Sequence, residues 1–309
     1  MAQPLFVRLR EKLGAIRIEV LAPPWVAPVL ARMPEVDEVI MVPFSHGALQ
    51  LKARWKIGRS LRGRGYGQAI VLPNSWKSAL VPFFADIPIR SGYVGESRYG
   101  LLNLLYKVQD ERPPMALHYA RLSERPGVAP AEPLPSPRLE ADAAAARATA
   151  TRFGLPARYV VFCPGAEYGP AKRWPYFREL AAHMQLPVVL LGSAADRAAG
   201  EGIGARNLAG ETTLDEAIEI LACAESVVTN DSGLMHVAAA LDRPQVALFG
   251  SSSPVHTPPL SPRARILWLK PECSPCYARE CPLGHFRCMK ELAPEQVRDE
   301  VKLLTSPPS

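Results

Sequence analysis

Short apolar runs and helical patterns alternate along the chain of 309 residues. In the first half, Leu5, Leu9 and Leu13 recur at helical spacing, and Gly14 should end that helix. The apolar runs that follow are typical of strands. We expect strands at 16–21, 39–42 and 69–72.

The second half shows the same alternation with clearer boundaries. We expect an alanine-rich helix at 139–152 and buried strands at 159–163, 187–191, 226–229 and 245–249. Continuous apolar strands with helices between them are typical of a parallel sheet covered on both faces. Small polar residues follow the strand ends, where open α/β sheets bind ligands. The pattern predicts an α/β protein with two Rossmann-like domains.

A proline-rich stretch separates the two series. Seven prolines lie between Pro113 and Pro137, which leaves room only for a short helix such as 115–122. We therefore predict an N-terminal domain at 1–137, with 113–137 as a linker. The C-terminal domain should span 138–309 and include a cysteine-rich segment at 273–288 and a C-terminal helix.

The net charge of +6 is unevenly distributed. Residues 1–137 hold 18 basic and 11 acidic residues, whereas 138–309 hold 18 and 19. No acidic residue lies between Glu38 and Asp86, a region with seven basic residues. This distribution favours an anionic partner for the first half, with a solvated basic helix as the alternative. The basic stretch lacks interleaved aromatic residues and any nucleic-acid motif, so we predict no nucleic-acid partner.

The strongest local signal follows the strand that ends near Asn230. The chain turns through Asp231, Ser232 and Gly233 into a helix that carries His236 one turn inside. A glycine lets a ligand approach the backbone, and the N–H groups and dipole of the helix favour an anion. Ordinary capping by Asp231 or Ser232 is the alternative. Capping does not explain a glycine and a histidine directed at one point.

A second signal is the loop at 164–175, which contains two glycines and three prolines. Adjacent Lys172 and Arg173 offer cations where a diphosphate could lie. A rigid loop with solvated basic residues explains the same pattern equally well.

A third signal is the loop at 192–196, in which Asp196 could accept hydrogen bonds from a ribose. A capping role for Asp196 is the alternative. The chain contains neither a GxGxxG fingerprint nor a GxxxxGK[ST] phosphate loop, which disfavours nicotinamide enzymes and common nucleotide triphosphatases.

Four cysteines with C-x2-C-x4-C-x6-C spacing lie near the C-terminus, with His285 among them. Such ligands suit zinc or an iron–sulfur cluster, but the spacing matches no standard zinc finger. A metal site, redox-labile thiols and a plain loop remain open, and we assign no metal or other cofactor. The four residues are Cys273, Cys276, Cys281 and Cys288.

Several blocks of sequence carry a resemblance to a known family. In the second half they are CPGAEYGPAKRWP, VVLLGSAADRAAG and the stretch from NLAGETTLDEA to FGSSSP. In the first half they are RMPEVDEV, VLPNSWKSALVPFF and RYGLLN. The chain resembles the heptosyltransferases of glycosyltransferase family nine, which have the two-domain GT-B fold.

The resemblance implies transfer of L-glycero-D-manno-heptose from ADP-heptose to the first heptose of the lipopolysaccharide inner core, with inversion. Lys172 would neutralise the leaving ADP, the backbone of 231–233 would hold the diphosphate, and Asp196 would bind the ribose. The donor-binding residues that it implies are Lys172, Asp196, Asp231, Ser232, Gly233 and His236. The acceptor-binding candidates in the basic first half are Arg59, Arg62, Arg64 and Lys77.

The start of the chain departs from the family pattern. Relatives begin with a strand and a glycine-containing loop whose Asp is the expected general base, ahead of a Met-Ala-Gln helix start. This chain begins at Met1-Ala2-Gln3. We therefore expect the first domain to lack its first strand and the base, and the working protein to be longer at its N-terminus. No catalytic residue is assigned.

Two alternatives remain. One is heptosyltransferase I or another family-nine transferase, and the other is a catalytically inactive ADP-sugar-binding protein. No apolar run approaches the roughly 18 residues of a membrane-spanning helix, and no signal peptide is recognisable. We expect a cytoplasmic protein that acts peripherally at the inner membrane.

Overall fold

The computed structural model describes residues 1–45, 47–108, 112–203 and 205–305, and the chain forms two compact units. The first unit comprises Met1–Pro24 and Ile40–Pro135, and the second comprises Trp25–Val39 and Ser136–Ser309. The division after Pro135 lies near the boundary predicted at 137. The segment Trp25–Val39 differs from the prediction, which placed it in the N-terminal domain.

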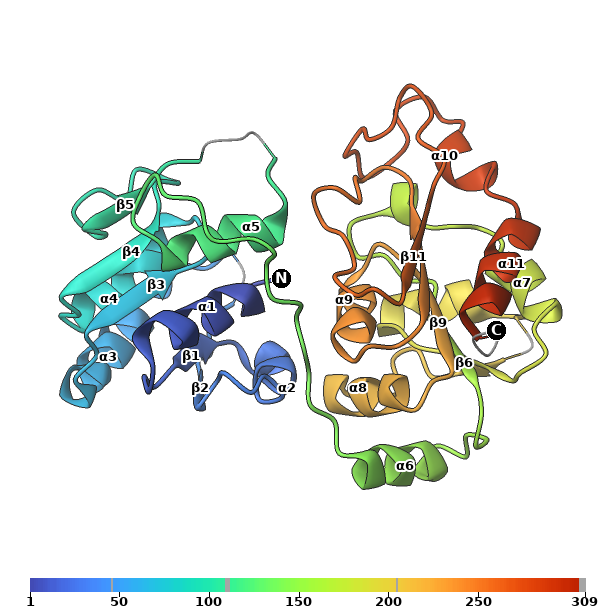
Figure 1. Cartoon of the computed structure of the whole chain (residues 1–309), viewed down its shortest axis with the longest axis horizontal. Coiled ribbons are helices and arrows are strands. Elements are labelled where there is room, and N and C mark those ends of the chain that lie inside the picture. Colours follow the sequence, from blue (N-terminus) through green and yellow to red (C-terminus); the bar gives the residue numbers. More distant parts are fainter. Residues whose placement is uncertain (46, 109–111, 204, 306–309) are drawn as a thin grey trace. The chain divides into compact units, whose positions relative to one another are not determined.

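A six-stranded parallel sheet forms the centre of the second unit, with the strand order β11-β10-β9-β6-β7-β8 (Figure 1). The strands are β6 (Val160–Cys163), β7 (Val188–Leu190), β8 (Arg206–Asn207), β9 (Ser226–Asn230), β10 (Gln245–Phe249) and β11 (Ala264–Trp268). Four of these confirm predicted strands. The sheet order changes direction between β6 and β9, so the loops after these strands lie at the switch point where doubly wound sheets bind ligands.

Helices cover both faces of this sheet, because alternate strand residues belong to separate cores. Val161 and Val189 belong to the core that includes α8, whereas Val160 and Val188 belong to the core that includes α7 and α11. Both faces of the sheet are therefore packed against helices and excluded from solvent, as expected for a parallel sheet. The helices are α6 (Ala143–Arg152), α7 (Phe177–Ala182), α8 (Leu214–Ala222), α9 (Gly233–Ala240), α10 (Arg287–Lys290) and α11 (Pro294–Thr305).

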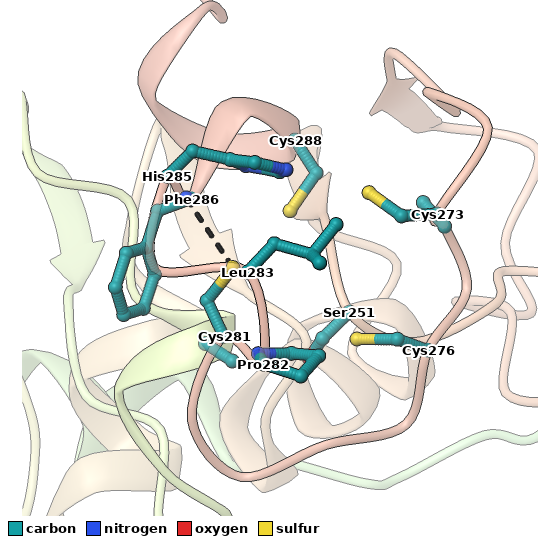
Figure 2. A pocket seen from close by; sticks show the side chains of 11 residues that line it. Ser251, Cys273, Cys276, Cys281, Pro282, Leu283, His285, Phe286 and Cys288 are labelled. Atoms are coloured by element: carbon teal, nitrogen blue, oxygen red, sulfur yellow. Dashed lines mark hydrogen bonds between the residues drawn. The ribbon is translucent and has the colours of Figure 1, made fainter.

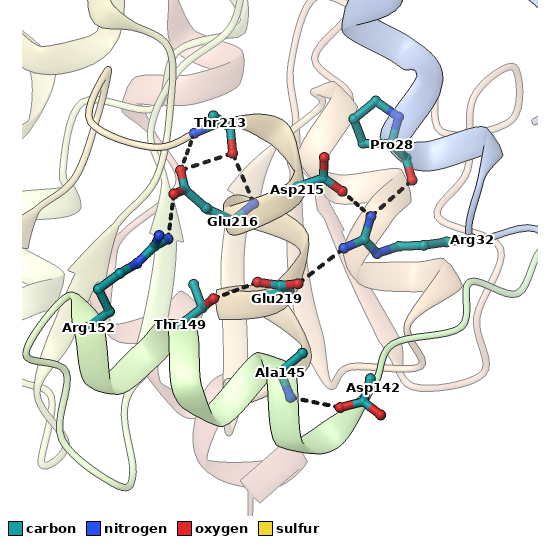
Figure 3. Close-up of polar contacts among 10 residues, drawn as sticks. All are labelled: Pro28, Arg32, Asp142, Ala145, Thr149, Arg152, Thr213, Asp215, Glu216 and Glu219. Carbon is teal, nitrogen blue, oxygen red and sulfur yellow. Dashed lines mark hydrogen bonds and ion pairs between the residues drawn. The ribbon is translucent and has the colours of Figure 1, made fainter. Parts of the chain in front are cut away.

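The segment Trp25–Val39 joins the second unit through side-chain packing and ion pairs. Val29, in α2 (Ala27–Leu30), and Met33 pack against the core that includes α8. Arg32 pairs with Asp215 and Glu219 on α8 (Figure 3). These contacts depend on residues almost 190 positions apart, which explains why the sequence pattern placed the segment in the N-terminal domain.

Helix α6 begins four residues later than predicted. The Asp142 side chain accepts a hydrogen bond from the Ala145 N–H at 2.7 Å and so caps the helix. Ahead of it, the Leu139 N–H donates to Ala240 and the Glu140 N–H to Arg32. Because these N–H groups bond to other parts of the unit, residues 139–141 do not continue the helix.

Two separate sheets occur in the first half of the chain. Strands β3 (Gln68–Val71), β4 (Ile89–Tyr93) and β5 (Leu104–Tyr106) form a parallel sheet, and β1 (Glu19–Ala22) pairs with β2 (Glu38–Met41). Among the described residues, no strand joins the two sheets. Besides α2, the α-helices described in this half are α1 (Gln3–Leu13), α3 (Leu51–Leu61), α4 (Leu80–Phe84) and α5 (Met115–Ala120).

The proline-rich stretch is more than a connection. Helix α5 lies within it and packs against α1, and residues up to Pro135 group with the first unit. Within the described ranges, no helix has the length and apolar character needed to span a bilayer.

Candidate functional site

Three loops of the second unit meet at the carboxyl ends of β6, β9 and β10. Lys172, in the loop after β6, places its Nζ 2.5 Å from Asp231 Oδ2, and Asp231 follows β9. Ser252, after β10, donates to the same oxygen at 2.6 Å. The side chains of Lys172 and Asp231 are only 17% and 6% exposed. The Asp231 carboxylate is therefore held by two donors, and it in turn holds the largely buried Lys172 ammonium.

The N-terminus of α9 lies directly after Asp231. Ser232 occupies the N-cap position, but among the described residues its hydroxyl makes no cap hydrogen bond and lies 3.2 Å from Thr229 Oγ1. The Asp231 side chain bonds to Lys172 and Ser252. The predicted alternative of ordinary side-chain capping is therefore not observed. The first-turn N–H groups remain available to an anion.

Gly233 opens this helix end to solvent. It is exposed, and a Cβ built on it would meet nothing within 4 Å. His236 lies one turn further and is partly buried. Burial lowers the pKa of the His236 imidazole below its usual value, so the ring is neutral at pH 7. It can therefore offer a hydrogen bond near the helix end without a positive charge.

Asn230 fixes the loop after β6 to the end of β9, a role that the sequence did not predict. Its side chain is fully buried, donates to the Pro164 carbonyl at 2.7 Å and accepts from the Trp174 N–H at 3.2 Å. These two bonds hold both ends of the loop that carries Lys172. The only sequence signal was its place at a strand end, which it shares with many structural residues.

Asp196 lies at the same edge of the sheet, after β7. Its Oδ2 accepts hydrogen bonds from the Ser193 N–H at 3.0 Å and the Ser193 hydroxyl at 2.7 Å. A Cβ on Gly165 would lie within 2.6 Å of the Asp196 carboxyl atoms, so only glycine fits there. Asp196 thus completes a capping box with Ser193. The predicted ribose contact stays a prediction.

The acceptor candidates of the first unit do not form one cluster. Arg62 pairs with Asp86 at 2.7 Å and donates to the Phe84 carbonyl at 2.9 Å, whereas Arg64 pairs with Glu19. Both arginines are thus engaged with neighbouring elements. They precede β3, and they therefore lie toward the amino end of its sheet.

Lys77 lies at the opposite end, in a short 3-10 helix (Trp76–Ala79) after β3. Arg59 lies on the exposed face of α3 and stacks over the Trp55 ring, with 5.9 Å between the guanidinium carbon and the ring centroid. Because ligands bind at the carboxyl ends of parallel strands, Lys77 is better placed for a bound substrate than Arg62 or Arg64.

Two buried arginines hold the loop that contains Lys77. Arg98 is fully buried and donates to the Pro73 carbonyl at 2.5 Å and to Ser78 Oγ at 3.2 Å. Arg54 donates to the Lys77 carbonyl at 3.1 Å. Sequence reasoning counted Arg54 among the seven basic residues between Glu38 and Asp86 that favour an anionic partner, and it gave Arg98 no role. A buried arginine cannot be told from a solvated one without knowledge of what folds over it.

The chain is similar to known proteins over most of its length. The model of glycosyltransferase family 9 (heptosyltransferase) matches residues 54–287. The chain is 44% identical to lipopolysaccharide heptosyltransferase 2 of Escherichia coli strain K12, over 98% of this chain and 94% of the relative. It is 44% identical to lipooligosaccharide heptosyltransferase 2 of Haemophilus influenzae, over 87% and 84%.

Solved structures show the same relationship. The structure of E. coli ADP-heptose lipopolysaccharide heptosyltransferase II matches with a TM-score of 0.88 and 42% identity, over 98% of this chain and 94% of that chain. The family model and this structural match identify the chain as a glycosyltransferase of the GT-B type. The chain belongs to glycosyltransferase family 9.

Proposed function

We propose that this chain transfers L-glycero-D-manno-heptose from ADP-heptose to the first heptose of the lipopolysaccharide inner core, with inversion at the anomeric carbon. The observation that carries the proposal is the α9 N-terminus, which lacks a side-chain cap and lies beside the buried Lys172–Asp231 pair. This is a site for a diphosphate that must leave with its negative charge. The 44% identity to heptosyltransferases 2 supports the choice of sugar and acceptor.

The chemical step moves charge onto the diphosphate. The bond between the anomeric carbon and the diphosphate oxygen breaks, and its electron pair leaves with ADP. The acceptor oxygen bonds to the opposite face of that carbon and releases its proton to solvent. The sugar gains oxocarbenium character as the diphosphate gains charge. N–H groups at residues 232 and 233 would stabilise the departing ADP, because they are oriented before the reaction begins.

Lys172 and Asp231 would have different tasks in this step. The Lys172 ammonium would face the diphosphate, whereas the Asp231 carboxylate would orient the ammonium rather than contact the phosphate. A carboxylate directed at the diphosphate would repel it. In the structure, Asp231 Oδ2 instead accepts hydrogen bonds from both Lys172 and Ser252. Neutral His236 would add a hydrogen bond, and Asp196 would contact the ribose.

The exposed face of α3 would bring the enzyme to an anionic lipid surface that carries the acceptor. Lys52, Trp55, Lys56 and Arg59 are exposed at helical spacing, and α3 contains no acidic residue. A basic helix face with an exposed tryptophan suits the headgroup region of an anionic membrane. Lys77 would then contact the acceptor itself. We expect sedimentation with anionic vesicles but not with neutral ones, and equal binding to both would refute this assignment.

Transfer can be tested with purified protein, ADP-heptose and two acceptors, one with a single inner-core heptose and one without heptose. We expect ADP release and a heptosylated product only with the first acceptor. Lys172→Ala should weaken ADP binding and abolish most of the transfer, whereas Lys302→Ala on α11 serves as the matched control.

Each alternative has its own outcome. Transfer only to the heptose-free acceptor would indicate a transferase of heptosyltransferase I type. ADP binding that depends on Lys172, without transfer to either acceptor, would indicate an inactive ADP-sugar-binding protein. Absence of ADP binding would contradict the placement of the donor.

A further inference from the structure

The cysteine-rich segment folds around one small cavity. All four of its cysteines line this space of about 20 Å³, which is roughly the room that one water molecule needs. In Figure 2 their sulfur atoms point toward the middle of the cavity. The four cysteines, which are all free thiols, are Cys273, Cys276, Cys281 and Cys288.

We propose that these four cysteines bind one zinc ion in a tetrahedral structural site. Four thiolates from one segment suit zinc, which prefers sulfur ligands and needs no redox partner. Binding would form four Zn–S bonds and release the four thiol protons to solvent. His285 also lines the cavity, but four sulfurs already complete a tetrahedral set, and the His285 Nδ1 accepts the Arg287 N–H at 3.0 Å. We therefore assign the ion to the sulfurs alone.

The backbone of the segment already has features of a thiolate site. Cys281 Sγ accepts a hydrogen bond from the Phe286 N–H at 3.4 Å, as sulfur ligands of metal sites do from nearby amides. Tyr277, Gly284 and Phe286 have positive φ values of 53°, 69° and 53°. Such residues reverse the chain sharply, and here they turn cysteines from one short segment toward a common space.

Zinc binding would draw the sulfurs closer together. Within the described ranges, no three histidine, cysteine or acidic side chains are already gathered closely enough to hold a metal ion. Figure 2 places the Leu283 side chain among the sulfurs. Leu283 is 62% exposed, so it can leave the cavity at little cost in buried apolar area. The required change is a local closure of one loop rather than a rearrangement of the core.

The same segment braces the loop that carries Lys172. The Ala171 N–H donates to the Arg279 carbonyl at 3.0 Å, and the Tyr168 hydroxyl donates to the Tyr277 carbonyl at 2.6 Å. Ser274 Oγ donates to the Gly250 carbonyl at 2.6 Å, next to the loop that holds Ser252. A zinc ion would therefore fix the support of both residues that contact Asp231.

Metal binding is tested directly on the reduced, chelator-treated full-length chain. We expect one equivalent of Co²⁺ to give the absorption of a tetrahedral cobalt thiolate, and Zn²⁺ to displace it. Cys276→Ser and Cys281→Ser should each weaken zinc binding at least about tenfold, because loss even of an outer-shell partner costs 10–100-fold. Cys276 is exposed, so its variant should keep the fold, as circular dichroism can verify.

Two controls and a second measurement distinguish this zinc site from zinc bound elsewhere on the chain. Cys223→Ser and His285→Ala should bind zinc like the unaltered chain. Zinc should also slow hydrogen exchange at the Ala171 amide, whatever the transfer activity is. Failure to bind zinc, unchanged binding in both cysteine variants, or iron that zinc cannot displace would each overturn the proposal. Unchanged exchange at Ala171 would overturn the link to the Lys172 loop.

Discussion

Charged side chains are held differently in the two units. In the second unit, Lys172 and Asp231 face each other at the sheet edge and are largely buried. In the first unit, the basic residues divide into two sets. Arg54 and Arg98 are buried and bind backbone carbonyls, whereas Lys52, Lys56 and Arg59 are exposed on α3.

This difference in burial indicates two different tasks for the charged side chains, namely precise positioning of a reacting group and long-range attraction of a charged partner. Buried charges are weakly screened and keep one geometry, so they suit a reaction in which charge develops at a fixed point. Exposed charges are screened over about 10 Å at 0.1 M salt, so they suit capture of an anionic surface. The two units thus divide these tasks between the candidate donor and acceptor sides.

The largest effect should come from Asp231→Asn. This change removes the charge that orients Lys172 while it keeps the side-chain size. We expect the transfer rate to fall on the order of 10²-fold, because a displacement of about 1 Å near a reacting group can cost this much. ADP affinity should change less than about tenfold, because the site loses a carboxylate that opposes the diphosphate.

Steady-state kinetics and ADP titration measure the two effects separately. Asp299→Asn, an exposed change on α11, is the matched control and should leave both unaltered. Combining Asp231→Asn with Lys172→Ala should add little to Lys172→Ala alone, since the two residues form one unit. Equal losses of binding and rate in Asp231→Asn would contradict an orienting role.

Next in size is Arg98→Met in the first unit. The change would remove this donor from the Tyr93 carbonyl, whereas the Pro73 carbonyl would keep the Ser78 hydroxyl at 3.1 Å. We expect a loss of about 2 kcal/mol in the free energy of unfolding, because unsatisfied buried polar groups cost about 1–3 kcal/mol. Urea unfolding followed by tryptophan fluorescence measures it, with exposed Arg125→Met as the control. A loss below about 0.5 kcal/mol would show that the loop does not depend on Arg98.

How far the sequence predicts a strand depends on the burial of that strand rather than on its unit. Strands β6, β7, β9 and β10 are buried on both faces, so they appear as continuous apolar runs. Strand β4 contains Arg90, Ser91 and Gly92, and β11 is largely exposed or half-buried, so neither carries such a signal. Strand β8 has only two residues.

The candidate site could likewise be predicted only in part from the sequence. Residues at strand ends could be selected because parallel strands bring their carboxyl ends to one edge. The bond from Ser252 to Asp231 and the role of Asn230 could not be predicted, because serine and asparagine are common after any strand. Their roles depend on the exact approach of loops that are 21 to 66 residues apart in sequence.

A smaller effect should follow loss of the exposed charges of α3. We expect the triple variant Lys52→Gln, Lys56→Gln and Arg59→Gln to bind anionic vesicles at least tenfold more weakly, at about 1 kcal/mol per charge near the surface. The difference should shrink as salt rises. Vesicle sedimentation at several salt concentrations measures it, and Arg158→Gln in the second unit is the control. Binding that resists salt and survives the triple change would remove α3 from the proposed membrane contact.

The smallest effect concerns a half-buried charge in the second unit, Glu216 on α8. Its carboxylate accepts the Thr213 N–H at 2.6 Å and pairs with Arg152 (Figure 3). The Thr213 N–H bond is the main cause that holds the pKa of Glu216 below its usual value. The folded chain therefore binds the proton less tightly than the unfolded chain, and the stabilisation is present above about pH 4.5 and lost as pH falls further.

We expect Glu216→Ala to cost about 0.5–1 kcal/mol at pH 7, as loss of a helix cap does, and less in acid. Glu216→Gln should recover most of this, because an amide oxygen can still accept the Thr213 N–H. Thermal unfolding from pH 3 to pH 7 measures both variants. If the glutamine variant were as unstable as the alanine variant, the charge rather than the cap would dominate. The effect should be small, in the same unit as Asp231, because Glu216 acts through an oxygen that caps a helix, whereas the charge of Asp231 orients an ammonium at the proposed donor site.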